Sequence, residues 1–449
     1  MKPILRRTLQ ITGFAAAMAL VVVGLNAGRA APSPPAHAES RPVPVALLQE
    51  AIPDSTPNAV QLRRGQYLVA AGDCLSCHLR EGGESFAGGL PLKTPFGTIY
   101  SANITSDRET GIGGWSNDQF YRAMHDGIDD QGANLYPAFP YPWFRAIDRA
   151  DDDAIFAYLK SLRAVTYTPP ANDLPFPFNF RFLVKGWNLL FLKTDPSRTD
   201  PAQSTEWNRG AYLVSGPGHC SACHTPKNLF GADKSDRFLQ GGVLDLWVAP
   251  DLTGNERTGL GRWSVDEIAE LLKTGRNAHA ETGGSMADVI NYSTALMTDQ
   301  DRHAIAVYLK GVPPSAAVSV ADADAGAMKR GAAIYQDACT GCHLENGVGQ
   351  PRYFPPLGNN AIVQQSDPTS VEHSILAGNR IGAGPSLPSQ FTMPSFAWKL
   401  TDAEVADVST FVRNSWGNRA APVSSASVGE VRKKLGLDQP RSALHSTGE

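Results

Sequence analysis

The sequence has no excess of positive charge and, beyond its N-terminus, no long apolar run. Its 449 residues include 40 lysines and arginines against 44 aspartates and glutamates, so the formal net charge is −4 at pH 7. Nucleic-acid-binding surfaces are normally basic, and this class of partner is therefore not expected. A membrane-spanning helix needs about 20 successive apolar residues, and no stretch after residue 30 provides one. The sequence also lacks a Gly-rich phosphate loop or a Ser, His and Asp set in a supporting context.

The N-terminus has the features of a secretion signal. Three basic residues precede an apolar run over residues 14–25, which is short for a membrane span. We interpret residues 1–30 as a signal peptide or an uncleaved anchor, and residues 31–57 as a Pro-rich linker. The remaining length suits two to four domains. Removal of residues 1–30 takes away four basic residues and no acidic one, which leaves a net charge of −8.

Cysteine is scarce, and all six cysteines lie in three copies of the pattern CxxCH. Zinc ribbons pair two CxxC units around one metal, but here the pairs lie more than a hundred residues apart. A thioredoxin-type dithiol or a structural disulfide needs no histidine after the second cysteine. The repeated histidine therefore argues against each of these alternatives.

Covalently attached haem c uses every element of the pattern. The two thiols form thioethers to the porphyrin, and the adjacent imidazole becomes the proximal iron ligand. We therefore expect three covalently bound haem c groups. The thioether residues would be Cys74, Cys77, Cys220, Cys223, Cys339 and Cys342, and the proximal ligands His78, His224 and His343.

Each motif belongs to a longer repeated unit. The leads "RGQYLVAAGD", "RGAYLVSGPGH" and "RGAAIYQDA" precede the three motifs and favour a helix. Each copy closes with an acidic, cap-like start and an apolar helical stripe, and the first two copies share "GIGGWS" and "GLGRWS". We predict a mainly α fold of three tandem domains of the class I cytochrome c type. Their expected bounds are 58–165, 203–312 and 325–419, with an aromatic inter-domain segment over 166–202, a linker over 313–324 and a tail over 420–449.

The aromatic segment allows two interpretations. Alternating phenylalanines in "FPFNFRF" precede "WNLLFL". Such residues either pack between domains or, if exposed, form a surface for a partner or a membrane.

The sixth iron ligand can be a methionine, whose thioether raises the reduction potential. In the third repeat the candidate is Met393, which lies in the extended loop "FTMPSF" just before the closing helix. In the second repeat we favour Met286 over Met297, because Met297 occupies a packing position ahead of the helix cap at Thr298.

The first repeat breaks this pattern. Its only methionine, Met124, corresponds in spacing to Leu272, an ordinary apolar helix position. The position that corresponds to Met286 falls within a residue of Phe139, and phenylalanine cannot bind iron. The first haem is therefore left with Met124, with His125 or with no sixth protein ligand. Another histidine, His219, is expected to border a haem edge or the solvent.

Longer phrases identify a resemblance. With "GPGHCSACHTPKNLFG", "GLGRWS", "FPPLGNNAIV" and "VRNSWGNRAAPVS", the chain resembles the triple-haem cytochrome c subunits of bacterial membrane-associated alcohol, aldehyde and sugar-acid dehydrogenases. In that family the Cys, Cys and His units map onto the three motifs, and the methionine ligands map onto Met286 and Met393. Where the alcohol dehydrogenase branch has "YPAMPY", this chain has "YPAFPY", which resembles subunits associated with molybdopterin hydroxylases.

The resemblance implies an electron-transfer subunit and no catalytic residues on this chain. It would take electrons from a large catalytic subunit carrying pyrroloquinoline quinone, flavin or molybdopterin, with a small third subunit as a further partner. It would pass them to membrane ubiquinone or a terminal acceptor, in the periplasm at the outer face of the inner membrane. Two other functions stay open at this point: a peroxidase-like haem enzyme that uses an open first haem, and a free soluble electron carrier.

Overall fold

The computed structural model describes residues 46–193, 198–244, 246–350, 352–380 and 392–440. The expected signal over 1–30, most of the linker over 31–57 and the end of the tail from residue 441 lie outside the described residues. Within the described ranges, every helix is too short or too polar to span a bilayer.

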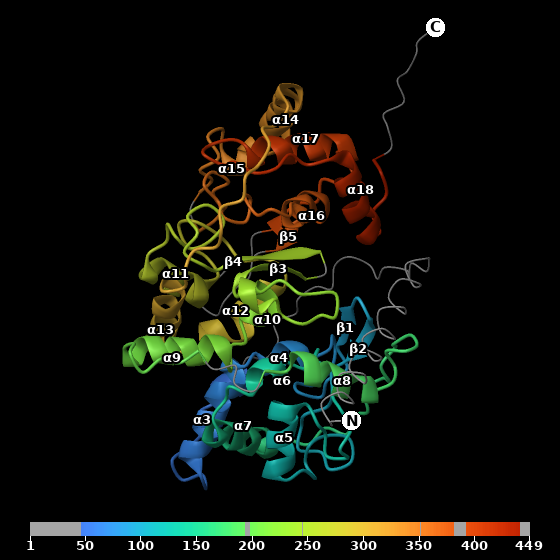
Figure 1. The fold of residues 1–449 in the computed structure, drawn as a ribbon, viewed down its shortest axis with the longest axis vertical. Helices are drawn as coiled ribbons and strands as arrows, with labels where there is room; N and C mark the ends of the chain where they lie inside the picture. The colour runs from blue at the N-terminus through green and yellow to red at the C-terminus, as the bar shows by residue number, and fades with distance from the viewer. Residues whose placement is uncertain (1–45, 194–197, 245, 351, 381–391, 441–449) are drawn as a thin grey trace, which may run out of the picture.

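Helices dominate the structure, as expected, and their order repeats three times (Figure 1). The first part contains α2 (Ala46–Gln49), α3 (Ala59–Ala71), α4 (Cys74–Cys77), β1 (Pro91–Thr94), β2 (Gly97–Tyr100), α5 (Asn117–Asp126), α6 (Tyr141–Phe144), α7 (Arg149–Ser161) and α8 (Phe182–Phe191). The second contains α9 (Thr205–Ser215), α10 (Ser221–His224), η1 (Ser235–Arg237), β3 (Gln240–Leu244), β4 (Trp247–Asp251), α11 (Val265–Thr274), α12 (Ser285–Tyr292), η2 (Thr294–Leu296) and α13 (Asp299–Lys310). The third contains α14 (Ala325–Ala338), α15 (Thr340–His343), α16 (Thr369–Ala377), β5 (Asn379–Arg380), β6 (Thr392–Met393), α17 (Asp402–Arg413) and α18 (Ser425–Lys434).

In each repeat the helix that leads into CxxCH packs against the closing helix through a glycine. A Cβ atom added to Gly65 of α3 would lie 1.9 Å from the Ala154 carbonyl oxygen of α7. One added to Gly210 of α9 would lie 2.0 Å from the Ala304 oxygen of α13, and Gly331 of α14 makes the corresponding contact with α17 at 2.2 Å. Since no side chain fits in this space, the glycine of the repeated Arg-Gly pair sets the distance between the two helices.

The arginine of the same pair joins the two helices by a bidentate ion pair. Both Nε and Nη2 donate to the carboxylate of an aspartate in the first turns of the closing helix, a geometry that fixes orientation as well as distance. The pairs are Arg64 with Asp151 (2.8 and 2.7 Å), Arg209 with Asp301 (2.8 and 2.6 Å) and Arg330 with Asp407 (2.6 and 2.9 Å).

The starts of the closing helices follow the sequence prediction with one exception, and two further helices have caps that were not predicted. The side chains of Thr298 and Thr401 cap α13 and α17, and Ser116 and Ser264 form capping boxes at α5 and α11. Asp148, which precedes α7, makes no side-chain cap bond. The closing helix of the first repeat therefore starts without the cap that the pattern predicted.

Three antiparallel hairpins, β1–β2, β3–β4 and β5–β6, are additions that the sequence analysis did not expect. Their strands contain two to five residues, too few for a period-2 pattern to emerge.

The first two repeats are joined by a reciprocal exchange of hydrogen bonds. The Tyr67 hydroxyl of the first repeat donates to Asp301 Oδ2 of the second at 2.5 Å, and the Tyr212 hydroxyl of the second donates to Asp151 Oδ2 of the first at 2.6 Å. Each carboxylate thus holds the arginine of its own repeat and the tyrosine of the other. We call this arrangement the tyrosine–aspartate junction.

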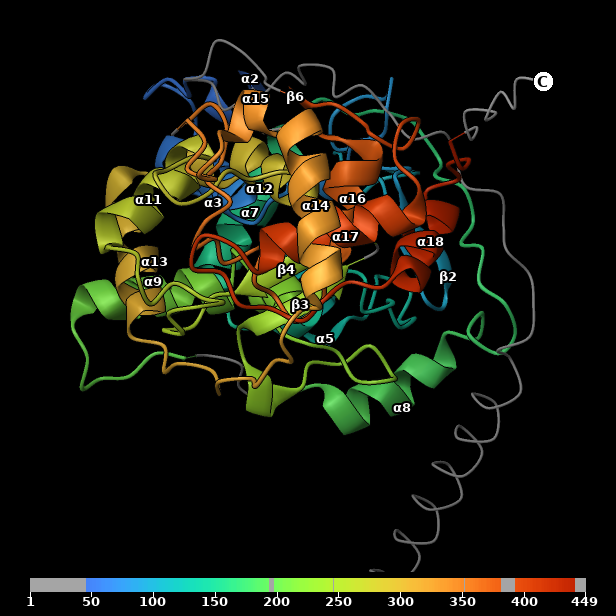
Figure 2. The same cartoon turned by 90° about the horizontal axis from the view of Figure 1, so that it is seen from above.

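The third repeat docks on the hairpin of the second. The ring of His373 in α16 stacks on Trp247 of β4 with centroids 4.0 Å apart, and the Val248 amide donates to Ser370 Oγ at 2.8 Å. In both views α16 lies beside β4 (Figures 1 and 2). The second repeat is therefore central and contacts both of the others.

The aromatic segment packs between domains on one side, and its other side is exposed. Trp187 Nε1 donates to the Phe230 carbonyl oxygen at 2.9 Å, and Phe191 packs on the Phe230 ring, so one side of α8 packs against the second repeat. The other side is exposed, with Phe182 at 63% and Leu189 at 81%. We call the exposed set the apolar patch: Phe176, Phe180, Phe182, Leu189 and Leu190.

The glycine contact predicts a large local cost for a methyl group. We expect Gly65→Ala to lower the free energy of unfolding by about 3 kcal/mol, because the added Cβ forces two helices apart. Gly114→Ala is the matched control, since its Cβ would have 3.6 Å to the nearest atom. Equal urea midpoints for the two variants would contradict this account.

The tyrosine–aspartate junction predicts a pH-dependent contribution. Burial opposes ionisation of Asp301, but hydrogen bonds from Arg209 and Tyr67 outweigh it and hold the pKa of this carboxyl below its usual value. The stabilisation is therefore present above the unfolded pKa of about 4 and is lost as the pH falls through the folded pKa.

We expect Tyr67→Phe to lower the free energy of unfolding by about 2 kcal/mol at pH 7, as for a bond to a charged group, and by less near pH 3. Denaturant unfolding at both pH values measures this difference. Tyr158→Phe is the control, because that hydroxyl donates to the neutral Leu47 carbonyl at 2.7 Å and its loss should not depend on pH. A deficit in Tyr67→Phe that is the same at both pH values would count against the ionised acceptor.

Candidate functional site

The three CxxCH motifs lie on short helices that directly follow the lead helices. In each motif the histidine Nδ1 is within hydrogen-bonding distance of a backbone carbonyl oxygen. The pairs are His78 with Ala102 (2.6 Å), His224 with Pro250 (2.7 Å) and His343 with Pro355 (3.0 Å).

These carbonyls determine which nitrogen of each ring carries the proton. A carbonyl oxygen only accepts, so Nδ1 must be the protonated nitrogen and Nε2 keeps its lone pair. Burial also lowers the pKa of all three histidines, against the smaller opposing effect of the carbonyl bond. A neutral imidazole with an oriented, free Nε2 is the form that binds a metal. Two thiols beside such a ring fit covalent haem attachment.

The thiols are unsuited to the alternative chemistries. All six cysteines are free, so no structural disulfide is formed. Burial raises the pKa of Cys74, Cys77 and Cys220 to about 12, and that of Cys223 and Cys339 to about 11. Redox-active dithiols instead have a lowered pKa and carry a thiolate near neutral pH.

In each repeat, one further partly buried residue packs against the same hydrophobic cluster as the first cysteine of the motif. Met286 lies in the first turn of α12, after Gly284, whose φ of 55° and contact with the Trp247 ring leave no room for a side chain. Met393 is held by the pairing of β6 with β5. The residues that share a cluster are Met286 with Cys220, Met393 with Cys339 and, in the first repeat, Phe139 with Cys74.

Among the remaining candidates, the two methionines are buried members of these clusters, whereas Met286, Met393 and Phe139 are only partly buried against them. Met124 is 4% exposed inside the first cluster, and its counterpart Leu272 is buried in the second. Met297 is buried inside the second cluster, as expected for a residue that contributes to core packing. His125 stacks on Tyr121 with ring centroids 3.9 Å apart.

His219 belongs to the second repeat but contacts the first. Its ring centroid lies 5.3 Å from that of Phe144. The expectation that it borders a haem edge stays a prediction, but the structure shows that one of its neighbouring rings, Phe144, comes from the other repeat.

The carbonyl acceptors were missed by the sequence analysis. A signal for two of them exists, because "ANIT" at Ala102 and "PDLT" at Pro250 occupy matching places. In both, the residue after the acceptor turns the chain by accepting the amide of a threonine, from Thr105 to Asn103 at 2.9 Å and from Thr253 to Asp251 at 2.7 Å. The tyrosines of the tyrosine–aspartate junction had no such signal.

The first two motifs adjoin each other. Helix α4 contacts α12, and Ser293 Oγ donates to the Ala71 carbonyl oxygen at 3.1 Å just ahead of the first motif. After burial and Asp73, the neighbouring Cys223 is a further cause of the raised pKa of Cys77. Figure 1 shows α4, α10 and α12 together where the first two repeats meet.

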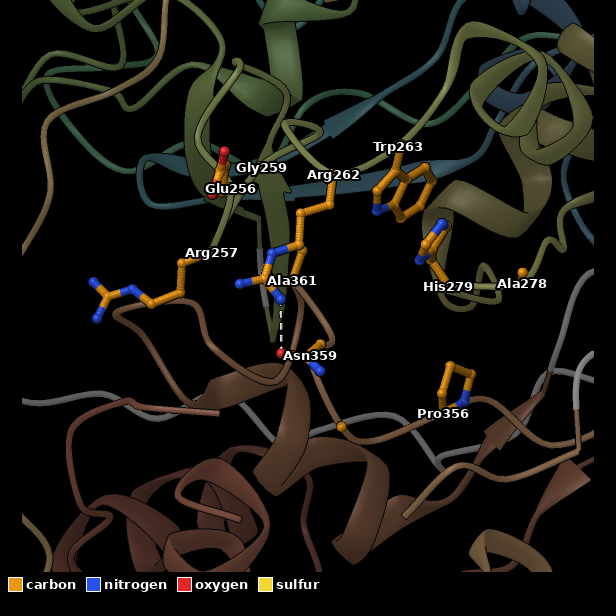
Figure 3. Close-up of a pocket in the computed structure, with 11 residues that line it drawn as sticks. Glu256, Arg257, Gly259, Arg262, Trp263, Ala278, His279, Pro356, Asn359 and Ala361 are labelled. Carbon is orange, nitrogen blue, oxygen red and sulfur yellow. Dashed lines mark hydrogen bonds between the residues drawn. The ribbon is translucent and has the colours of Figure 1, made fainter. Parts of the chain in front are cut away.

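A cavity of about 320 Å³ lies between the second and third repeats (Figure 3). Arg262 Nη1 donates across it to Asn359 Oδ1 at 2.7 Å, and His279 stacks on Trp263 at its wall. Pro356, which also lines it, follows the carbonyl that accepts from His343. The cavity therefore adjoins the third motif.

Comparisons with known proteins agree on one class. The family model for cytochrome c matches residues 328–416. The alcohol dehydrogenase (quinone) cytochrome c subunit of Gluconobacter oxydans is 39% identical, covering 82% of this chain and 80% of that protein. The gluconate 2-dehydrogenase cytochrome c subunit of Pantoea cypripedii is 38% identical, covering 85% and 92%. The fructose dehydrogenase cytochrome subunit of Gluconobacter japonicus is 34% identical, covering 86% and 85%.

Proposed function

This chain belongs to the family of cytochrome c subunits of bacterial dehydrogenase complexes, and from that premise we propose that three covalently bound haem c groups relay electrons along it. The chain is an electron-transfer subunit, and substrate oxidation takes place on a partner subunit. The observation that carries the count of three is the set of three imidazoles, each beside two thiols and each with Nδ1 committed to a carbonyl.

Met286 and Met393 are proposed as the sixth ligands of the second and third haems. Both lie at the edge of the cluster that includes the first cysteine of their repeat. A thioether opposite an imidazole favours reduced iron and raises the potential. These haems would then accept electrons readily.

The three repeats are proposed to be three cytochrome c domains over 58–165, 203–312 and 325–419. Three hydrophobic clusters support this division, since each is built mainly from one repeat, although the second includes Ala71 and the third includes Val428 and Val431 of α18. Because the first two motifs adjoin, electrons would pass directly between the first and second haems. The second repeat contacts both of the others, so electrons would pass through it between the first and third haems.

The partner is proposed to be a large dehydrogenase subunit of the pyrroloquinoline quinone, flavin or molybdopterin type, with a small third subunit as a further component. Ubiquinone or a terminal acceptor would receive the electrons in the periplasm, at the outer face of the inner membrane. The apolar patch supports such an assembly, because exposed apolar clusters of this kind mark interaction surfaces. The relatives do not favour the alternatives of a peroxidase-like enzyme or a free carrier.

Haem stoichiometry tests this function. The full chain, purified from a host able to attach haem c, should carry three haems by mass and by pyridine haemochrome. Changing both cysteines of one motif to alanine should remove one haem and leave two. Three haems that survive this change, or a mature chain that carries none, would refute covalent attachment at these motifs.

The axial methionines have a separate test. Met286→Ala or Met393→Ala should lower the potential of that haem by on the order of a hundred millivolts, within the ~0.8 V range that axial ligands control. Met297→Leu and Met124→Leu are the controls and should leave all potentials near their starting values. Redox titration followed by absorption measures these shifts, and an unchanged titration in Met286→Ala would remove it from the ligand set.

A further inference from the structure

We propose that the haem attached at Cys74 and Cys77 has no sixth ligand from the protein, and that its free face is an apolar site for a neutral diatomic molecule such as carbon monoxide or nitric oxide. This inference rests on the proposed function, because it needs haem at the first motif. It goes further by giving one of the three haems a ligand-binding role.

Phe139 distinguishes the first repeat from the other two. In the second and third repeats a methionine and the first cysteine of the motif pack against one hydrophobic cluster. In the first repeat the position that corresponds in spacing to Met286 falls within a residue of Phe139, which packs with Cys74 against the hydrophobic cluster of that repeat. A phenyl ring presents only carbon, so it fills the position of the ligand without supplying a donor atom.

Two neighbouring rings hold Phe139 in this place. Its ring packs edge-on against Phe144 with centroids 5.8 Å apart and tilts against Tyr141 at 6.3 Å, and both of these rings are buried. The Tyr141 hydroxyl donates to Asn188 Oδ1 of α8 at 2.5 Å, so its polar end is already engaged. The wall that these rings form is aromatic carbon.

Core packing excludes the neighbouring methionine, Met124, as the sixth iron ligand. Met124 lies on α5 inside the first cluster, at the position where α11 carries the buried Leu272. A leucine at the same place in a sister repeat shows that this position is occupied by core packing. To bind iron, the Met124 thioether would have to leave that core.

Two imidazoles, those of His125 and His219, lie near the aromatic rings of the first repeat. The His125 ring stacks on Tyr121, and its neighbours Arg145, Ile147 and Arg149 lie around the start of α7. Its Nε2 has no hydrogen-bond partner, which makes His125 the side chain whose substitution tests the assignment most directly. His219 reaches the outer face of Phe144 from the second repeat and is the second side chain to test.

The chemistry of this wall selects the ligand. Open haem sites take exogenous ligands, and the polarity of the distal pocket decides which ones. An apolar wall gives no hydrogen bond to an anion, whose desolvation would then be uncompensated. Neutral carbon monoxide or nitric oxide bears no such cost.

Binding of this kind has a consequence for the relay. The ligand adds a donor bond to reduced iron, and no electron or proton is exchanged in this step. By linkage, a ligand that prefers reduced iron stabilises the reduced state of that haem. The first haem would then release electrons less readily, so the ligand would slow transfer to the second haem.

The test uses the full chain with its haems attached and carbon monoxide as the probe. We expect a high-spin signal from one haem in three in the oxidised protein, and a carbon monoxide difference spectrum from one haem in three after reduction. His125→Gln, His219→Gln and Met124→Leu should leave both spectra unchanged. A fully low-spin protein that binds no carbon monoxide would overturn the proposal, and so would a high-spin haem that arises only in one of these three variants.

Reciprocal substitutions provide the matched control. Phe139→Met should abolish carbon monoxide binding, whereas Met286→Phe should double it, because it copies the first repeat into the second. Met297→Phe, a change within the same cluster as Met286, should leave binding at one haem. If Phe139→Met does not fold, Met286→Phe and the wild-type spectra still decide whether the first haem lacks a sixth protein ligand.

Haem content distinguishes a failure of this inference from a failure of the proposed function. Three haems with no open site would refute this inference and leave the proposed function intact. A first motif without haem would refute both.

Discussion

The structure depends on one repeated contact, in which an arginine and a glycine hold the lead helix against the closing helix. The glycine brings the two backbones together, and the bidentate ion pair with an aspartate fixes their rotation. The CxxCH loop begins within a few residues of the end of the lead helix. Its thiols and imidazole therefore take their position from this crossing in each of the three repeats.

The same aspartates also organise the chain between repeats. Asp151 and Asp301 each accept from the arginine of their own repeat and from the tyrosine of the other. The geometry inside the first two repeats is thus coupled to the geometry between them. For an electron-transfer subunit this coupling is useful, because transfer between adjacent haems depends on a constant separation, and a hinge at this junction would vary it.

Similarity of scaffold does not make the three sites equivalent. By spacing along the repeats, Met286 corresponds to within a residue of Phe139, and each of these side chains packs against the hydrophobic cluster of its own repeat. Under the proposed ligand set, this one side chain would separate a haem site with a sixth donor from a site without one. The surrounding fold can tolerate the exchange because methionine and phenylalanine both pack as large apolar residues.

The sequence by itself determined the mainly helical fold, the repeats and the six cysteines and three histidines of the motifs, because these rest on local spacing and composition. It also located Phe139, since the position follows from counting along aligned repeats. Only the tertiary structure decided which carbonyls orient the imidazoles, that Tyr67 and Tyr212 cross between repeats, and that His219 lies against Phe144. The physical reason is that these contacts join residues far apart in the chain, and neither periodicity nor a motif carries information about them.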